Sequence, residues 1–150
     1  MNKNVCRIKF ELMTFTISAP VTDTINNGNA GLNDDALGEC SIDSFAVSGS
    51  LGGGGSPVIC GSNSGQHLYV DVDGMNCANA NFNFNDDAVS RQYDIRVLQY
   101  DCRNEFAGPT GCLQYFTGSE VTFTSFNFIG TASGSGNFHL ANQDYDICFR

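Results

Sequence analysis

Cysteine is the residue type of this sequence with the most evident chemistry. Two histidines, His67 and His139, lie far apart, and the seven cysteines include no CxxC pair: Cys6, Cys40, Cys60, Cys77, Cys102, Cys112 and Cys148. Because structural zinc sites draw ligands from closely spaced pairs, this spacing argues against a zinc knuckle. A disulfide framework is the expected use of the cysteines, with free buried thiols as the alternative. Since the count is odd, one cysteine must stay free or bond outside these residues.

Other motifs of catalysis are missing from the sequence. It contains no GxSxG, no HExxH and no neighbouring Cys and His arrangement. The GGGG run at 52–55 is not followed by the Lys and Ser or Thr that complete a phosphate-binding loop, so a hairpin tip is the better interpretation. His67 and His139 are interpreted as surface or strand histidines. We therefore expect no enzymatic activity.

Charge and the length of apolar runs argue against nucleic-acid binding and against membrane insertion. Sixteen acidic and seven basic residues give a net charge of −9. Such a chain is repelled by the phosphates that dominate nucleic-acid affinity. No apolar run approaches the roughly 18 residues of a membrane span.

The first twenty residues are interrupted by Arg7, Lys9 and Glu11, where a signal peptide needs an apolar stretch. A disulfide-bonded protein with this start is interpreted as a fragment of a longer, secreted chain whose signal peptide is not in this sequence.

Two segments that alternate apolar and polar residues predict a β-hairpin. These are NANFNFN at 79–85 and QYDIRVLQY at 92–100. The register that brings their apolar faces together pairs Phe82 with Val97 and Phe84 with Ile95. Continued outward, it sets Cys77 against Cys102 and predicts a disulfide there. Cys6 is then left unpaired or with an external partner.

Further alternating segments predict further strands. Ile8, Phe10 and Leu12 share one phase, and the apolar positions then shift to Phe15 and Ile17, which a bulge near Met13 would explain. A similar change of phase within 121–128 and the alternation of 145–149 indicate two more strands. Glycine- and asparagine-rich turns lie at 26–35, 49–55, 72–76 and 131–137. The chain is therefore predicted to be an all-β, antiparallel β-sandwich.

The segment CSIDSFAVSG, followed after a glycine-rich loop by PVICGSNSGQHLYVDVDG, resembles the CUB domain. In that family a cysteine precedes an aspartate-containing strand, a second cysteine followed by glycine closes a disulfide, and an apolar strand leads to an acidic turn. Cys40, Asp43, Cys60, Gly61 and Asp73 occupy these places here. The resemblance implies a CUB-like jelly roll, stapled by a disulfide between Cys40 and Cys60.

The resemblance also suggests how the chain divides into modules. CRIKFELMTFTI and RQYDIRVLQY are similar to later strands of a CUB module whose first strands are missing, which predicts one module over 1–101. GCLQYFTGSEVTFTSFNF and NFHLANQDYDICFR look like the opening half of a second module over 102–150, with Cys112 and Cys148 as its first pair. These phrases are similar to secreted arthropod proteins with tandem CUB-like modules.

Family resemblance further implies a function and a candidate metal site. Many CUB modules bind calcium through a glutamate and two aspartates; Asp43 and Asp73 match the aspartates, while Ser18 stands where the glutamate is expected. The implied function is a secreted, non-catalytic module that binds extracellular proteins or glycans. The alternative is a structural subunit of an extracellular filament or matrix, which self-associates by strand exchange between chains. No cofactor other than calcium is expected.

Overall fold

The computed structural model describes residues 4–21, 37–49, 55–73, 77–85, 90–128 and 139–150. Strands form nearly all of the regular structure of these residues, which also include a short 3-10 turn, η1 (Glu105–Ala107). In chain order the strands are β1 (Val5–Thr16), β2 (Asp43–Ser48), β3 (His67–Asp71), β4 (Asn79–Phe84), β5 (Gln92–Asp101), β6 (Cys112–Phe116) and β7 (Asp146–Phe149). The predicted turns at 26–35 and 131–137, and parts of those at 49–55 and 72–76, lie outside the described residues.

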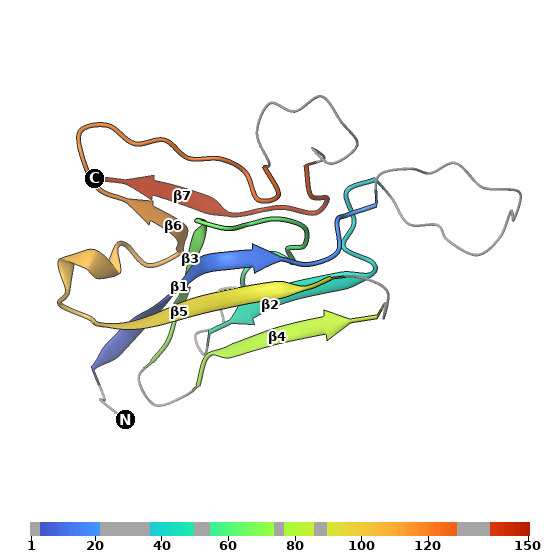
Figure 1. The fold of residues 1–150 in the computed structure, drawn as a ribbon. Coiled ribbons are helices and arrows are strands. Elements are labelled where there is room, and N and C mark those ends of the chain that lie inside the picture. Colours follow the sequence, from blue (N-terminus) through green and yellow to red (C-terminus); the bar gives the residue numbers. More distant parts are fainter. Residues whose placement is uncertain (1–3, 22–36, 50–54, 74–76, 86–89, 129–138) are drawn as a thin grey trace, which may run out of the picture.

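Three small sheets build the structure (Figure 1). The first has the antiparallel order β3-β1-β5, the second pairs β2 with β4, and the third pairs β6 with β7. The first two pack face to face, and the ring of Phe15 in β1 lies 5.3 Å from that of Phe45 in β2 and 6.4 Å from that of Phe82 in β4. This confirms an all-β, disulfide-stapled sandwich.

Strand β1 contains the predicted irregularity at Met13. Its pairing with β5 shifts register between Leu12 and Thr14, so the intervening Met13 is an extra residue in the ladder and is exposed. Leu12 before the shift and Phe15 after it are both fully buried. The bulge therefore keeps apolar side chains on the core face although their phase in the sequence changes.

The predicted hairpin between 79–85 and 92–100 is wrong. Phe82 pairs with Phe45 of β2, and Ile95 pairs with Leu12 of β1. The alternating pattern correctly identified the apolar face of each strand but could not identify its partner. Strand β1 offers β5 a ladder of ten paired residues, whereas β4 has only six residues to pair. The two segments instead meet across the sandwich, where the rings of Phe82 and Tyr93 stack 4.5 Å apart.

The third sheet combines one confirmed and one incorrect prediction. The alternation of 145–149 corresponds to β7, which runs parallel to β6. The strand expected within 121–128 does not form, because polar groups of this segment bond to side chains of the turn before β3. Gln66 donates to the carbonyl oxygen and hydroxyl of Thr124, and Asn63 accepts from the backbone N–H of Asn127. These bonds hold the segment against the sandwich without a ladder.

The hydrophobic core runs across the predicted boundary at 101/102. Leu113, Phe126 and Leu140 belong to the same cluster of buried side chains as Phe10 and Leu12. In addition, the buried Arg7 of β1 forms an ion pair with Asp71 (2.7 Å) and donates to the carbonyl oxygens of three residues from the second predicted segment: Ala107, Pro109 and Cys112. Both predicted segments thus contribute to one core, and their division into two modules stays a prediction.

Three disulfides join the described strands and loops. Cys40–Cys60 and Cys112–Cys148 form as the resemblance implied, with Cα–Cα distances of 5.6 and 5.8 Å. The predicted bond between Cys77 and Cys102 is wrong, since Cys102 bonds to Cys6 and Cys77 is an exposed free thiol. The cause is the same as for the hairpin. Because β5 pairs with β1 rather than β4, residue 102 is brought to the start of β1.

Candidate functional site

The predicted metal ligand Asp43 lies at the start of β2 and is almost completely buried. Arg91 donates from Nε to Oδ2 and from Nη2 to Oδ1, both at 2.8 Å. Ser18 adds its backbone N–H at 3.0 Å and its hydroxyl at 2.8 Å, both to Oδ2. The hydrogen bonds from Arg91 are the main reason that the pKa of Asp43 is well below its usual range, so the carboxylate stays charged.

These contacts do not fit a calcium site. Calcium takes six to eight oxygen ligands. Here both carboxylate oxygens of Asp43 accept hydrogen bonds from the Arg91 guanidinium, and the Ser18 hydroxyl donates to the same carboxylate. Asp73, the other predicted ligand, is exposed after the end of β3. Within the part of the chain that the structure describes, no three His, Cys, Asp or Glu side chains are grouped to hold a metal ion.

The two histidines differ in environment. His67 begins β3, and its ring contacts those of Tyr69 and Phe116 at 5.6 and 4.8 Å. Its Nε2 accepts from the backbone N–H of Tyr115 at 3.3 Å, so it joins β3 to β6. Burial lowers the pKa of His67 to about 4, which leaves the imidazole neutral at physiological pH. His67 is thus the strand histidine that the sequence analysis expected, and His139 is exposed.

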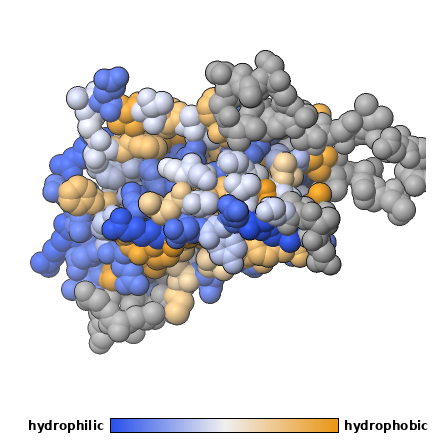
Figure 2. All heavy atoms as spheres, viewed as in Figure 1, coloured by the Kyte–Doolittle hydropathy of each residue, from blue (hydrophilic) through white to orange (hydrophobic). Residues whose placement is uncertain are grey.

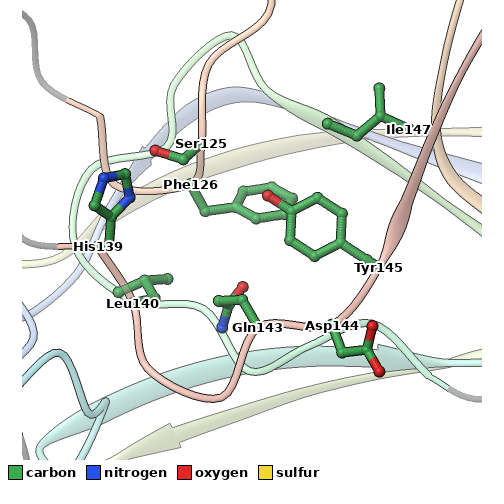
Figure 3. A pocket seen from close by; sticks show the side chains of 8 residues that line it. All are labelled: Ser125, Phe126, His139, Leu140, Gln143, Asp144, Tyr145 and Ile147. Atoms are coloured by element: carbon green, nitrogen blue, oxygen red, sulfur yellow. The ribbon is translucent and has the colours of Figure 1, made fainter.

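A shallow pocket of about 460 Å³ lies beside His139 (Figure 3). The rings of Phe126 and Tyr145 lie together in it, 5.4 Å apart. Ser125, His139, Gln143 and Asp144 supply hydroxyl, imidazole, amide and carboxylate groups around these rings. Burial raises the pKa of the Tyr145 phenol, which stays protonated and can donate a hydrogen bond. Because Phe126 is buried, the pocket combines the half-buried ring of Tyr145 with hydrogen-bonding groups, a composition suited to binding.

A cluster of three phenylalanines, two of them exposed and one half-buried, lies where β6 and β7 end, and we call it the aromatic face. It consists of Phe116, Phe123 and Phe149, with ring centroids 5.4 to 6.3 Å apart. Phe123 and Phe149 are 50% and 54% exposed. The rings are held in place because β6 pairs with β7, Cys112 bonds to Cys148, and Phe116 packs on His67. Exposed, preorganised aromatic clusters of this kind are typical of protein-binding surfaces.

Sequence reasoning did not identify the aromatic face. It assigned alternating aromatic residues of 121–128 and 145–149 to the core-facing sides of strands, because alternation signals one apolar face. Only the third sheet, with its parallel pairing and the irregular 121–128 segment, shows that Phe123 and Phe149 point to solvent. The available signal was the run of closely spaced phenylalanines at Phe123, Phe126 and Phe128.

Comparison with known proteins gives one finding. The family model of the animal CUB domain matches residues 109–150, a segment that contains the aromatic face, the pocket and the disulfide Cys112–Cys148. Neither the curated proteins nor the solved structures give a match to this chain. The three disulfides fit an extracellular protein. No helix among the described residues is long and apolar enough to cross a membrane.

Proposed function

We propose that this chain, whose residues 109–150 match the family model of the animal CUB domain, is a secreted, non-catalytic module that binds another extracellular protein through its aromatic face. The observation that carries the proposal is the exposure of Phe123 and Phe149 on a disulfide-anchored support. Each ring can bury a large apolar area on contact with a partner, and little side-chain entropy is lost because the rings already pack on one another.

The surroundings of the aromatic face favour a protein partner. Glu120 lies three residues before Phe123 in the sequence and Arg150 directly follows Phe149, and both are exposed. Aromatic residues at the centre and charged residues at the edge are the usual arrangement of a protein–protein interface. The net charge of −9 further favours a partner with a basic surface, whose approach it would accelerate.

A binding screen with a matched control tests this function. The oxidised chain is immobilised and probed with a panel of purified extracellular proteins by surface plasmon resonance. Phe123→Ser should weaken binding to a true partner at least tenfold, whereas Phe128→Ser should leave it unchanged. Phe128 is equally exposed, at 50%, but is not one of the three clustered rings. Equal loss in both variants, or no loss in Phe123→Ser, would refute the assignment of the aromatic face.

Glycans are the second partner class, and the pocket of Figure 3 favours them. Its half-buried Tyr145 ring, which packs on the buried Phe126, offers an apolar surface, and its polar groups can donate to and accept from hydroxyls. A glycan array separates the two classes, since glycan binding should be lost in Tyr145→Ala and retained in Phe123→Ser. The remaining alternative, a filament subunit built by strand exchange, predicts association that grows without limit as concentration rises.

A further inference from the structure

Strand β5 is the last strand of its sheet, and no described strand pairs with its outer edge. The core-facing side of this edge is only partly covered. Tyr93 and Val97 stand opposite the buried Phe15 and Phe10 of β1, yet each is 52% exposed. In Figure 2, orange, apolar atoms lie below a row of blue atoms in the region that β5 and β4 occupy in Figure 1. An edge with unpaired backbone groups and exposed apolar side chains is a template for another strand.

The opposite side of β5 carries two charges of opposite sign. Asp94 and Arg96 alternate with Tyr93, Ile95 and Val97 along the strand. Arg96 approaches Glu11 of β1 at 3.6 Å and remains well exposed, and Glu11 in turn accepts from Lys9 at 2.8 Å. The outer surface of the sheet thus carries charges of alternating sign that end at the edge of β5.

We propose that β5 pairs with β5 of a second copy of this chain, antiparallel and centred on Ile95. In this register Asp94 of each copy stands directly opposite Arg96 of the other, so two opposite-charge pairs form across the seam. Tyr93 stands opposite Val97 in the same two-fold manner, an aromatic and β-branched pair that favours strand association. Residues 92–98 of both copies are paired, and the two three-stranded sheets become one of six strands.

The side chains of β5 discriminate against other registers. Centring the pair on Asp94 would oppose two aspartates, and centring it on Arg96 would oppose two arginines, both of which repel. An intermediate register would join the core-facing side of one copy to the outer side of the other, because directly opposed residues lie on one side of a sheet. The centre at Ile95 satisfies the charges and the apolar residues together.

The inferred contact is distinct from the proposed binding surface. The aromatic face lies on β6 and β7, which neighbour β3 at the other end of the β3-β1-β5 sheet. It therefore stays accessible in the dimer. Because each copy uses the same strand, the contact is two-fold and closes, so it yields a dimer rather than a filament.

Charge reversal provides a specific experiment. Sedimentation velocity is measured on the oxidised chain with the thiol of Cys77 alkylated, for the natural sequence, for Asp94→Arg and for Arg96→Asp. Each single reversal opposes like charges at both pairs and should raise the dimer dissociation constant at least about tenfold. An equimolar mixture of the two variants should form a heterodimer, because both charge pairs across the seam then again join opposite charges.

Matched controls separate this pairing from effects of net charge. Asp146→Arg and Arg103→Asp make the same changes of charge at exposed positions outside β5 and should leave the dimer intact. Circular dichroism should show the same fold in all variants. A natural chain that is monomeric at high micromolar concentration overturns the proposal. So do single variants that dimerise like the natural chain, or a mixture that fails to associate. Each of these outcomes leaves the binding screen of the aromatic face unaffected.

Discussion

Asp43 and Arg91 form a two-point ion pair that connects the two main sheets of the sandwich. Asp43 begins β2 in one sheet, and Arg91 directly precedes β5 in the other. Both hydrogen bonds measure 2.8 Å, and the side chain of Asp43 is fully buried. The guanidinium also lies 4.8 Å from the ring centre of Phe84 in β4. The ion pair thus holds the start of β5 against the β2–β4 sheet.

Replacing Arg91 with Met should destabilise the protein by about 3 kcal/mol, because it leaves the buried carboxylate of Asp43 without its cation. Urea denaturation followed by circular dichroism measures this difference in unfolding free energy. Arg103→Met, at an exposed position, should change it by less than about 0.5 kcal/mol. Equal effects of the two substitutions would contradict the role of the ion pair.

The same ion pair predicts an acid dependence. The folded-state pKa of Asp43 is below its unfolded value, so its contribution to stability is fully present above the unfolded pKa of about 4 and is lost as the pH falls further. The difference in unfolding free energy between the natural chain and Arg91→Met should therefore shrink below about pH 4. A difference that is constant down to low pH would contradict this interpretation.

Arg7 should be required to hold the 105–116 segment against β1. Its guanidinium is buried and satisfies the carboxylate of Asp71 as well as three carbonyl oxygens around η1 and the start of β6. Arg7→Met should therefore cost about 3 kcal/mol or more and raise hydrogen exchange in residues 105–116. Hydrogen exchange in the β2–β4 sheet should change less, when Arg7→Met and the natural chain are each measured equally far below their own unfolding midpoints. Uniform loss of protection would argue for a global effect only.

Disulfide mapping should find Cys77 as the free thiol. Alkylation of the native protein followed by mass spectrometry should label Cys77, and peptides joined through Cys6 and Cys102 should be recovered. Cys77→Ser should leave the unfolding free energy unchanged. Cys6→Ser opens a loop closed over 96 residues and should cost about 4 to 5 kcal/mol in the loop-entropy model. A bond between Cys77 and Cys102 would contradict the observed strand pairing.

His67 should make stability pH-dependent in the mildly acidic range. Burial lowers its folded-state pKa to about 4, below the unfolded value of 6.5. The unfolded state therefore binds the proton first, and stability is present above about pH 6.5 and is lost as the pH falls towards 4, by up to about 3 kcal/mol. His67→Gln keeps an acceptor for the N–H of Tyr115 and should flatten this dependence. His139→Gln is the control and should not.

Calcium should not stabilise the described sandwich. The oxygens of Asp43 are engaged by Arg91 and Ser18, so a cation would have to displace an existing one. We expect the melting temperature to be the same with millimolar calcium and with a chelator. A calcium-dependent rise that disappears in Asp73→Asn would restore the ligand assignment of the sequence analysis.

Local patterns in the sequence were sufficient where a feature depends on neighbouring residues alone. The alternation around Leu12 and Phe15 fixed the core face of β1 and required a bulge at Met13, because side chains alternate across a strand whatever its partner. The alternation of NANFNFN likewise identified β4 and its apolar face. The all-β class follows from such segments and the turns between them, and the pairs Cys40–Cys60 and Cys112–Cys148 followed from family resemblance.

Tertiary structure decided which strands meet. An alternating strand is compatible with any partner of matching phase, so the sequence could not distinguish β4 from β1 as the neighbour of β5. Because β5 pairs with β1, Cys102 bonds to Cys6 and not to Cys77. The same holds for the sites. The pairing of Asp43 with Arg91 and the exposure of Phe123 and Phe149 depend on contacts between segments far apart in the chain. Such contacts are set by how three sheets share one core, and this packing leaves no local pattern in the sequence.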